Sequence, residues 1–482
     1  MKHYLISLFI LSTILPFAIM ADDKDDLIDK VIHAYGGDAV TSLKSYQIYE
    51  HYLGPATGQS HSPSITEINK TAVSLIVETE TGRSAFDTLN TGRAGSFQGS
   101  TISDGKSAFN INFQNNTFGT ANNADYRAFG GSAIRTSDAV LVYELNRVRE
   151  EAILEESENH LNRPHKVITM PFTQSPDLHL YIDSETFLIS KMVRVHQAFG
   201  RLSYLFSDYQ QNNGITYAST IHFSLDGQPN LIGTKKEIKF NGAYPDSLFR
   251  VPAGFAEQGE RIDTSTMSAN PLSKRAVHVG ENGAFSLFVN TSMGTIGVGG
   301  SAGLAQRYQH YQRNNDVSKP LTYQIITHHH ADHLDGINDA VKLGAKAVTV
   351  AANVDVIAGR LDSELQGNNI ISIDKRSTLG EGGGRVELFE ISTIHADGYL
   401  LVYVPADKLL FMADHYGSPF ATGLPTANQN SVDMLKAIDE LGLDVKQIAT
   451  AHNARIFTMK ELRSSVKKFK PTNCSGNRPV CA

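Results

Sequence analysis

The sequence THHHADHLDG, residues 327–336, is the most informative stretch of this chain. It follows an apolar run, residues 321–327, that is typical of a buried strand. Side chains two positions apart in an extended segment point to the same side, so His328 and His330 can bind one metal ion together. Asp332 and His333 come next, just before an expected helix over residues 335–343, and Gly336 allows the backbone to turn. The alternative for three adjacent histidines is a solvated surface tract.

Three further ionisable residues stand at the ends of expected strands. His395 follows residues 391–394, Asp414 follows residues 409–413, and His452 follows residues 448–451. Strand ends are where a rigid scaffold presents side chains into a shared cleft. Each residue alone is typical of a structural histidine or a turn aspartate. Together with the H-x-H-x-D-H run, they indicate a metal site with enough ligands for two ions.

Length and composition set broad limits on the class of protein. The chain has 482 residues, a net charge of −7 and a hydrophobic content of 41%, which predicts two or three domains. The mild acidity gives no indication of a nucleic-acid partner. The single dense basic run, residues 467–470, lies near the end of an expected helix, where cations favour the helix dipole.

The two ends of the chain predict export. Residues 1–21 have the basic start, apolar run and small residue of a cleavable secretory signal, and the run is too short for a stable membrane anchor. The only cysteines, Cys474 and Cys481, are expected to form a disulfide that staples the tail, residues 471–482. We therefore expect a periplasmic or secreted protein.

The region from residue 22 to 262 is expected to be a mainly β accessory domain. A helical stripe over residues 25–35 is followed by alternating segments that predict a curved antiparallel sheet, interrupted by one helix over residues 137–158. The region resembles lipoprotein-carrier-type periplasmic domains at AYGG (34–37), FSDY (206–209) and LFRVP (248–252). That resemblance implies a half-barrel sheet that holds an acyl chain or a similar apolar ligand; the alternative is a purely structural accessory domain.

A linker over residues 263–275 precedes the second domain, residues 276–470. Expected strands and helices alternate there, with hairpins between them, which fits two mixed sheets sandwiched by outer helices. The fold class of the whole chain is therefore predicted to be α+β.

Residues 276–470 resemble the metallo-β-lactamase-fold hydrolase superfamily. THHHADHLDG matches the first motif of that superfamily, and the later ligands follow in the same order. The resemblance implies an αββα sandwich with a metal cleft at one edge. It assigns the first metal to His328, His330 and His395, and the second to Asp332, His333 and His452, with Asp414 bridging both.

Two zinc ions suit this set, because zinc favours imidazole with some carboxylate and catalytic sites keep a position open for water. The expected reaction is attack by metal-bound hydroxide on an ester, thioester, lactone, amide or phosphoester, with Asp332 positioned near the hydroxide. His329 should point to the other side of its strand and has no ligand role. Tyr399, His415 and Asn453 neighbour ligands and are candidates to contact substrate or to support the ligands.

Details of the pattern separate the branches of the superfamily. Having Asp414 and His333 together resembles the glyoxalase II, lactonase and phosphodiesterase branches, and His330 argues against the flavin-partnered di-iron reductases. One departure is the stretch VGGS, residues 298–301, where many relatives carry an aspartate. The absence of this aspartate puts the metal affinity and the reaction rate in question.

Two alternative functions remain open at this stage. One is a mononuclear iron sulfur (persulfide) dioxygenase on the same scaffold. The other is a periplasmic carrier of apolar ligands that keeps metals without turnover. The expected partner is a small-molecule substrate, hydrophobic if the N-terminal region binds acyl chains.

Overall fold

The computed structural model describes residues 17–197, 200–315, 318–470, 474 and 477–481. These residues form two compact units, and both are discontinuous in sequence. The first contains residues up to Glu50, Leu75–Arg83 and Asp125–Tyr244; the second contains His51–Ser74, Ser84–Ala124 and all residues from Pro245 onward. The predicted domain boundaries stay predictions. Most of the predicted secretory signal lies outside the described residues.

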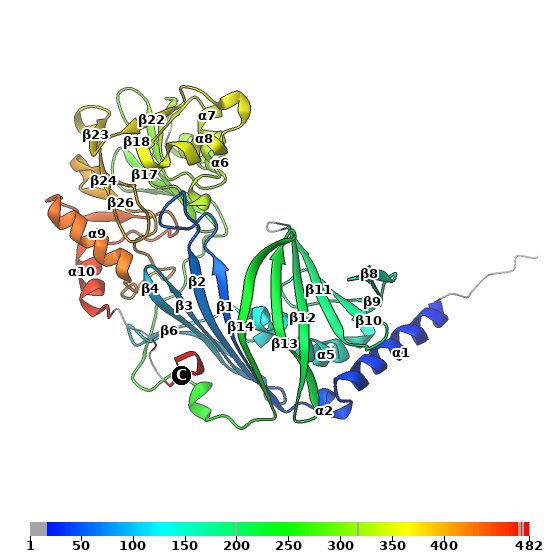
Figure 1. Ribbon diagram of the computed structural model, residues 1–482. Coiled ribbons are helices and arrows are strands. Elements are labelled where there is room, and N and C mark those ends of the chain that lie inside the picture. Colours follow the sequence, from blue (N-terminus) through cyan, green and yellow to red (C-terminus); the bar gives the residue numbers. More distant parts are fainter. Residues whose placement is uncertain (1–16, 198–199, 316–317, 471–473, 475–476, 482) are drawn as a thin grey trace, which may run out of the picture. The chain divides into compact units, whose positions relative to one another are not determined.

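The first unit is an antiparallel sheet with helices packed against it. Its strands follow the order β14-β13-β12-β11-β10-β9-β7, and β8 pairs with β9. Helices α1 and α5 pack on β13 (Figure 1), and Tyr35 in α1 donates a hydrogen bond of 2.9 Å to the buried Asp138 in α5. The elements are α1 (Phe17–Tyr35), α2 (Asp38–Thr41), α3 (Tyr126–Phe129), α4 (Gly131–Arg135), α5 (Asp138–Arg147), η1 (Arg149–Glu151), β7 (Ile153–Leu154), β8 (Glu158–His160), β9 (Arg163–Met170), β10 (Leu178–Asp183), β11 (Ile189–His196), β12 (Gly200–Asn212), β13 (Ile215–Leu225) and β14 (Gln228–Phe240).

The prediction of one helix over residues 137–158 was wrong in its second half. Helix α5 ends at Arg147, and the chain then forms η1 and the short strands β7 and β8. Ile153 pairs with Thr169 and Leu154 with Ile168 of β9. Residues 153 and 154 therefore form a strand with β9 instead of continuing the helix. Four acidic side chains between residues 150 and 156 also repel one another on a helix, which weakens the local preference.

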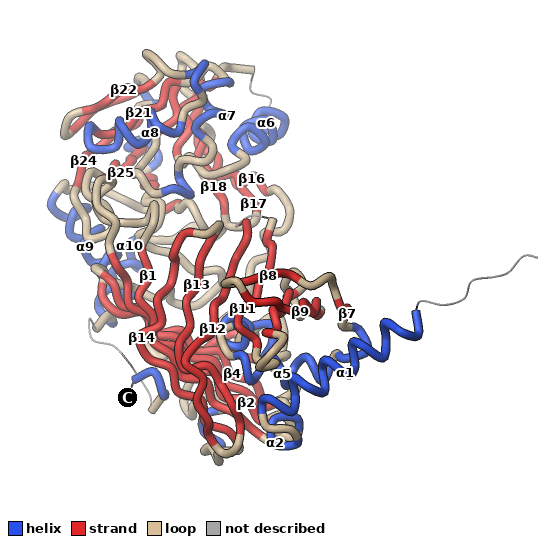
Figure 2. Tube along the Cα trace, turned by 45° about the vertical axis from the view of Figure 1, so that its right-hand side comes forward, coloured by secondary structure: helices blue, strands red, loops and turns tan. Residues whose placement is uncertain are grey.

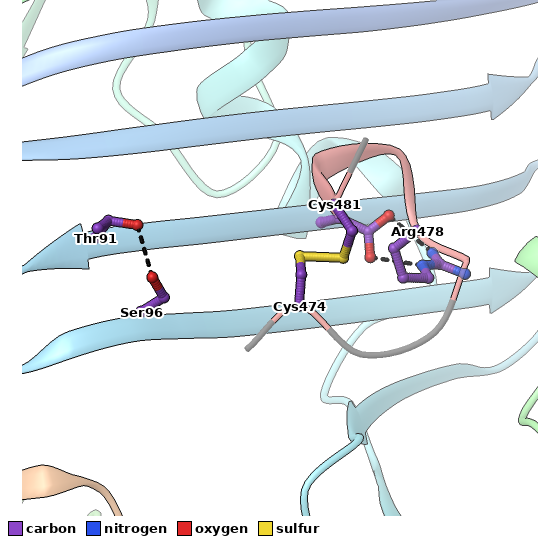
Figure 3. Close-up of a disulfide and its surroundings, with 6 residues drawn as sticks. Thr91, Ser96, Cys474, Arg478 and Cys481 are labelled. Carbon is purple, nitrogen blue, oxygen red and sulfur yellow. Dashed lines mark hydrogen bonds and ion pairs between the residues drawn. A yellow bond between two sulfur atoms is a disulfide. The ribbon is translucent and has the colours of Figure 1, made fainter. Parts of the chain in front are cut away.

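The second unit contains most of the strands that follow in the order β15-β6-β5-β4-β3-β2-β1, whereas residues 45–50 of β1, 75–78 of β2 and Arg83 of β3 belong to the first unit. The tail is attached to these strands. The predicted disulfide between Cys474 and Cys481 is present, and Arg478 beside it forms an ion pair with Asp87 of β3 (Figure 3). The elements are β1 (Ser45–Pro55), β2 (Ile68–Glu78), β3 (Arg83–Gly92), β4 (Gly95–Asp104), β5 (Ala108–Asn112), β6 (Thr117–Thr120), η2 (Asp246–Leu248), β15 (Ala256–Glu257) and η8 (Pro479–Cys481).

The remainder of the second unit is a four-layer sandwich. A seven-stranded sheet, β16 to β22 in sequence order, faces a five-stranded sheet, β23 to β27 in sequence order (Figure 2). The strands are β16 (Ser268–Pro271), β17 (Ala276–Glu281), β18 (Ala284–Asn290), β19 (Thr295–Val298), β20 (Leu321–Ile325), β21 (Lys346–Val350), β22 (Ile370–Ile373), β23 (Arg376–Leu379), β24 (Val386–Ile391), β25 (Tyr399–Val404), β26 (Leu409–Phe411) and β27 (Gln447–Ala449).

Helices cover both outer faces of the sandwich. Helices α6 (Leu304–Asn315), α7 (Ile337–Lys342) and α8 (Val354–Arg360) pack on the larger sheet, while α9 (Gln429–Glu440) and α10 (Met459–Lys468) pack together on the smaller one. One core of buried side chains joins both sheets, including Val298, Val348, Leu401 and Phe411. Near-continuous apolar strands such as β25, buried along its whole length, are what a layer covered on both faces requires. The predicted α+β class with an αββα sandwich is confirmed.

Among the residues that the structure describes, no helix is both long and apolar enough to cross a membrane.

Candidate metal centre

The stretch 327–336 leaves β20 as an extended segment and then turns sharply. His330 is still extended, residues Ala331–His333 form a single 3-10 turn, and α7 begins at Ile337. Two glycines permit this turn to lie against the neighbouring segment. A Cβ on Gly300 would lie 2.3 Å from the carbonyl oxygen of His333, and one on Gly336 would lie 2.4 Å from that of Ser301. The glycine-rich stretch 298–301 therefore has a packing role of its own.

The other ligands come from the ends of three strands in the smaller sheet. His395 lies in the loop between β24 and β25, Asp414 follows β26, and His452 follows β27. Strands β26 and β27 are parallel neighbours, so their carboxyl ends bring Asp414 and His452 to the same edge. All seven predicted ligands thus meet at one edge of the sandwich, although they come from both sheets.

The first group of ligands consists of His328, His330, His395 and Asp414, whose ligand atoms all lie within 4.8 Å of one another. The Nε2 atoms of His328 and His395 are 3.1 Å apart, and Asp414 Oδ2 is 3.3 and 3.0 Å from them. Four ligands at Zn–N distances of 2.0–2.1 Å from a tetrahedral ion would be about 3.3 Å apart. The spacing of these atoms fits a metal ion.

The second group consists of Asp332, His333 and His452. His452 Nε2 is 3.3 Å from both His333 Nε2 and Asp332 Oδ2. Asp414 also reaches this group. Its Oδ1 lies 2.9 Å from His333 Nε2 and 3.1 Å from His452 Nε2, and its Oδ2 lies 3.0 Å from His333 Nε2. One carboxylate therefore faces both groups, which is the arrangement of a bridging ligand.

Two of the histidines form a hydrogen bond through one ring nitrogen, which orients the other ring nitrogen toward the ligand groups. The Nδ1–H of His452 donates to the carbonyl oxygen of Gly283 at 2.9 Å, which leaves Nε2 as a lone-pair donor. His330 has the opposite tautomer: its Nε2–H donates to the carbonyl oxygen of Ser60 at 3.1 Å. Its Nδ1 is buried and, among the described residues, makes no hydrogen bond, so Nδ1 is the ligand atom that this residue offers.

The pKa values of the candidate ligands favour the binding of cations. Burial lowers the pKa of His330 to about 3 and that of His328 well below its usual value, so both imidazoles stay neutral and able to coordinate. Burial alone would raise the pKa of Asp414, but the charge of His333 and hydrogen bonds from the surrounding histidines hold it well below its usual range. His452 has a pKa raised to about 10: despite burial, hydrogen bonds to Asp332 and Asp414 favour its protonated form. The two carboxylates that favour a proton on His452 would also favour a metal cation at this position.

The three residues predicted to surround the ligands lie in different settings. Tyr399 stacks on His328 with ring centroids 5.2 Å apart, and His415 is fully buried behind His395, with Nε2 3.0 Å from Thr393 Oγ1. Both lie behind the ligands, where they can support them. Asn453, together with His452, lines a cavity of about 210 Å³ and is therefore open to a ligand from solvent. Their roles in catalysis stay predictions.

Sequence reasoning missed the loop between β1 and β2, residues 56–67. His329, predicted to have no ligand role, donates from Nε2 to Ser60 O at 2.8 Å, and Gln59 donates to Asp332 Oδ1 at 2.7 Å. The loop carries no metal-binding motif, and more than 260 residues separate it from the stretch that it contacts. No local signal could have identified it.

Comparisons with known proteins found similar chains only among solved structures. No family model matches the sequence, and a search of curated proteins found no match. Among solved structures, a metallo-β-lactamase from Pontibacter korlensis matches 42% of this chain over 98% of its own, with 18% identity and a TM-score of 0.34. One from Hirschia baltica matches 42% of this chain over 97% of its own, with 14% identity and a TM-score of 0.33.

A third match is the stereoselective inverting sec-alkylsulfatase Pisa1 from Pseudomonas sp., which covers 42% of this chain and 41% of its own, with 12% identity and a TM-score of 0.32. The αββα sandwich with a His/Asp ligand cluster at its edge is what the resemblance to the metallo-β-lactamase fold predicts. The candidate metal centre is assigned from the geometry of this cluster.

Proposed function

We propose that the protein is an exported metallohydrolase that uses two zinc ions to cleave an ester, thioester, lactone, amide or phosphoester bond. The observation that carries this proposal is Asp414, whose two oxygens face two adjoining ligand groups. A site for a single ion needs only the first group, so the second group favours the two-metal hydrolase over a one-iron dioxygenase. Export is supported by the apolar N-terminal run and the tail disulfide.

The seven side chains fit the donor set of zinc, with five imidazoles and two carboxylates. When bound, two such ions lower the pKa of a water molecule to roughly 7 and polarise the bond to be cleaved. The site is buried on one side and open to solvent on the other. The side chain of His328 is fully buried, whereas those of His452 and Asp332 are 39% and 45% exposed.

A substrate would therefore approach through the second group. The cavity of about 210 Å³ beside His452 and Asn453 is also lined by Arg261 and by the segment around Ser418. Its size suits one functional group of a small molecule rather than a polymer. A guanidinium there would favour substrates with an anionic or carbonyl group next to the scissile bond.

The test is elemental analysis of protein purified without added metal, compared with Asp414→Ala and with Asp444→Ala, an exposed carboxylate in the same part of the chain. We expect about two zinc ions per chain in the wild type and in Asp444→Ala, and fewer than one in Asp414→Ala. A screen of ester, thioester, lactone, β-lactam and phosphodiester substrates should then show turnover that depends on Asp414. One iron per chain that is indifferent to Asp414, or two metals without any turnover, would contradict the proposal.

A further inference from the structure

The loop between β1 and β2, residues 56–67, lies directly against the metal-binding stretch. The backbone N–H of Ala331 donates to the carbonyl oxygen of Gly58 at 2.9 Å, and that of Asp397 donates to His61 at 2.9 Å. His61 in turn donates from Nε2 to the carbonyl oxygen of Thr393 at 3.0 Å. The loop therefore contacts both ligand-bearing segments, the one before α7 and the one that carries His395.

Two contacts from this loop reach the ligands themselves. The carbonyl oxygen of Ser60 accepts from His330 Nε2, which fixes the tautomer that leaves Nδ1 free toward the centre. Gln59 donates from its amide to Asp332 Oδ1 at 2.7 Å. That bond leaves Oδ2 of Asp332 facing His452 Nε2 at 3.3 Å and His333 Nε2 at 3.5 Å.

Asp332 needs such a partner because it is the least enclosed of the ligands. Its side chain is 45% exposed, so rotation about its bonds would carry Oδ2 away from the other members of the group. An amide donor fixes the carboxylate without neutralising it, whereas a lysine or arginine there would compete with the metal for its charge.

The loop is held in shape by contacts that involve none of the candidate metal ligands. Ser60 donates from its hydroxyl to the carbonyl oxygen of Ala56 at 2.9 Å, and the same hydroxyl accepts from the backbone N–H of Glu67 at 3.0 Å. Glu67 also accepts from the backbone N–H of His61 at 3.2 Å and pairs with Arg93 at 2.5 Å. These bonds close the loop around Ser60 and place Gln59 at its tip.

We propose that the loop of residues 56–67 is a working part of the metal centre, with Gln59 as the positioning residue for Asp332 and the Ser60 carbonyl as the positioning group for His330. The inference rests on the metal centre of the proposed function but not on the hydrolysis that it performs. It makes the region before residue 262 a contributor to the site, so a fragment of residues 276–470 alone has lost two of the contacts that orient its ligands.

The experiment replaces Gln59 by Leu in the full chain, with Ser62→Ala as the control. Among the residues that the structure describes, the Ser62 hydroxyl bonds only to Ser64 of the same loop. Gln59 is exposed, so the variant should fold. Zinc binding is measured by competition with a chromophoric chelator. The ion held by Asp332, His333 and His452 should lose about 10- to 100-fold in affinity, while the ion of the other group is unchanged. Ser62→Ala should bind both ions like the wild type.

A second readout separates positioning from general damage. The visible absorption of protein loaded with Co²⁺ should change for the second ion in Gln59→Leu and return toward the wild type in Gln59→Asn supplied with the same metal. Thermal unfolding of the metal-free protein should be the same in all variants. Equal zinc affinities in wild type and Gln59→Leu, or an equal loss at both sites with a lower unfolding temperature, would overturn the inference. Failure of the wild type to bind two ions would instead overturn the proposed function.

Discussion

His278 in β17 is a single buried residue that should make the protein sensitive to acid. Burial lowers its pKa to about 4, although the hydrogen bond from its Nε2 to the carbonyl oxygen of Thr450 acts in the opposite direction. Its buried Nδ1 has no hydrogen-bond partner among the described atoms. The unfolded chain binds a proton at this histidine with a pKa near 6.5. The contribution to stability is therefore complete above about pH 6.5 and falls as the pH drops toward 4.

We predict that His278→Gln reduces this acid sensitivity. Between pH 7.5 and pH 5 the wild type should lose about 2 kcal/mol of unfolding free energy through His278, and the variant should lack that loss. Chemical denaturation at the two pH values, on metal-free protein, measures the difference. His33→Gln, at an exposed position of α1, serves as the control and should keep the pH dependence of the wild type. An identical pH dependence in the His278 variant would show that another group carries the effect.

At the scale of the element, α6 holds the turn that supports the ligand stretch. Arg307 in α6 is almost fully buried, and it donates from Nη2 to the carbonyl oxygen of Ser301, from Nη1 to that of Ala302, and from Nε to Ser286 Oγ. The adjacent Gly300 carbonyl accepts from the N–H of Gly336 at 2.8 Å. A buried arginine from the following helix therefore stabilises the turn 298–301.

Arg307→Met should therefore cost about 1–3 kcal/mol of unfolding free energy, since the carbonyl oxygens of Ser301 and Ala302 lose their donor while the desolvation of the charge is relieved. The variant should also bind the second zinc ion more weakly, because His333 lies against Gly300. Denaturant titration and chelator competition measure the two effects. Arg313→Met, on the exposed side of α6, is the matched control. A variant as stable as the control would mean that the turn holds its shape without Arg307.

Elements could be predicted from the sequence where local pattern and tertiary demand agree. The strand before THHHADHLDG and the helices after it are examples, because apolar periodicity and glycine turns specify them locally. The prediction of a helix over residues 137–158 was wrong beyond Arg147, because residues 153 and 154 pair with β9. Such long-range pairing has no signal in the local sequence. The cluster of seven candidate ligands could be predicted because each of these residues follows a strand. Gln59 could not be predicted, since nothing local connects it to Asp332 at a separation of 273 residues.

At the scale of the whole molecule, the tail is tied to β3 by a buried ion pair. Arg478 donates to both oxygens of Asp87 at 2.8 and 2.9 Å, and it also donates to the carbonyl oxygen of Leu248. Their side chains are only 6% and 0% exposed. Arg478→Met would leave Asp87 as an unpaired buried charge, and we expect a loss of about 3–5 kcal/mol in unfolding free energy.

The double variant Arg478→Met, Asp87→Leu should recover much of that loss, because it leaves no buried charge behind. Denaturant titration of the two single variants and the double variant gives the coupling energy. Arg463→Met, which breaks an exposed pair with Asp439, should cost less than about 1 kcal/mol. If the double variant were no more stable than Arg478→Met alone, the tail would be needed for its packing rather than for its charge.

Metal removal should destabilise the sandwich as a whole, because the ligands come from both of its sheets. His328, His330, Asp332 and His333 follow β20 in the larger sheet, whereas His395, Asp414 and His452 lie at strand ends of the smaller one. A metal that binds only the folded arrangement adds about 2.7 kcal/mol when free metal is 100 times its Kd. Chelation should therefore lower the midpoint of thermal unfolding by about 5–10 °C. Asp414→Ala, already depleted of metal, should show little further change with the same chelator, and an equal shift in both proteins would place the stabilising metal elsewhere.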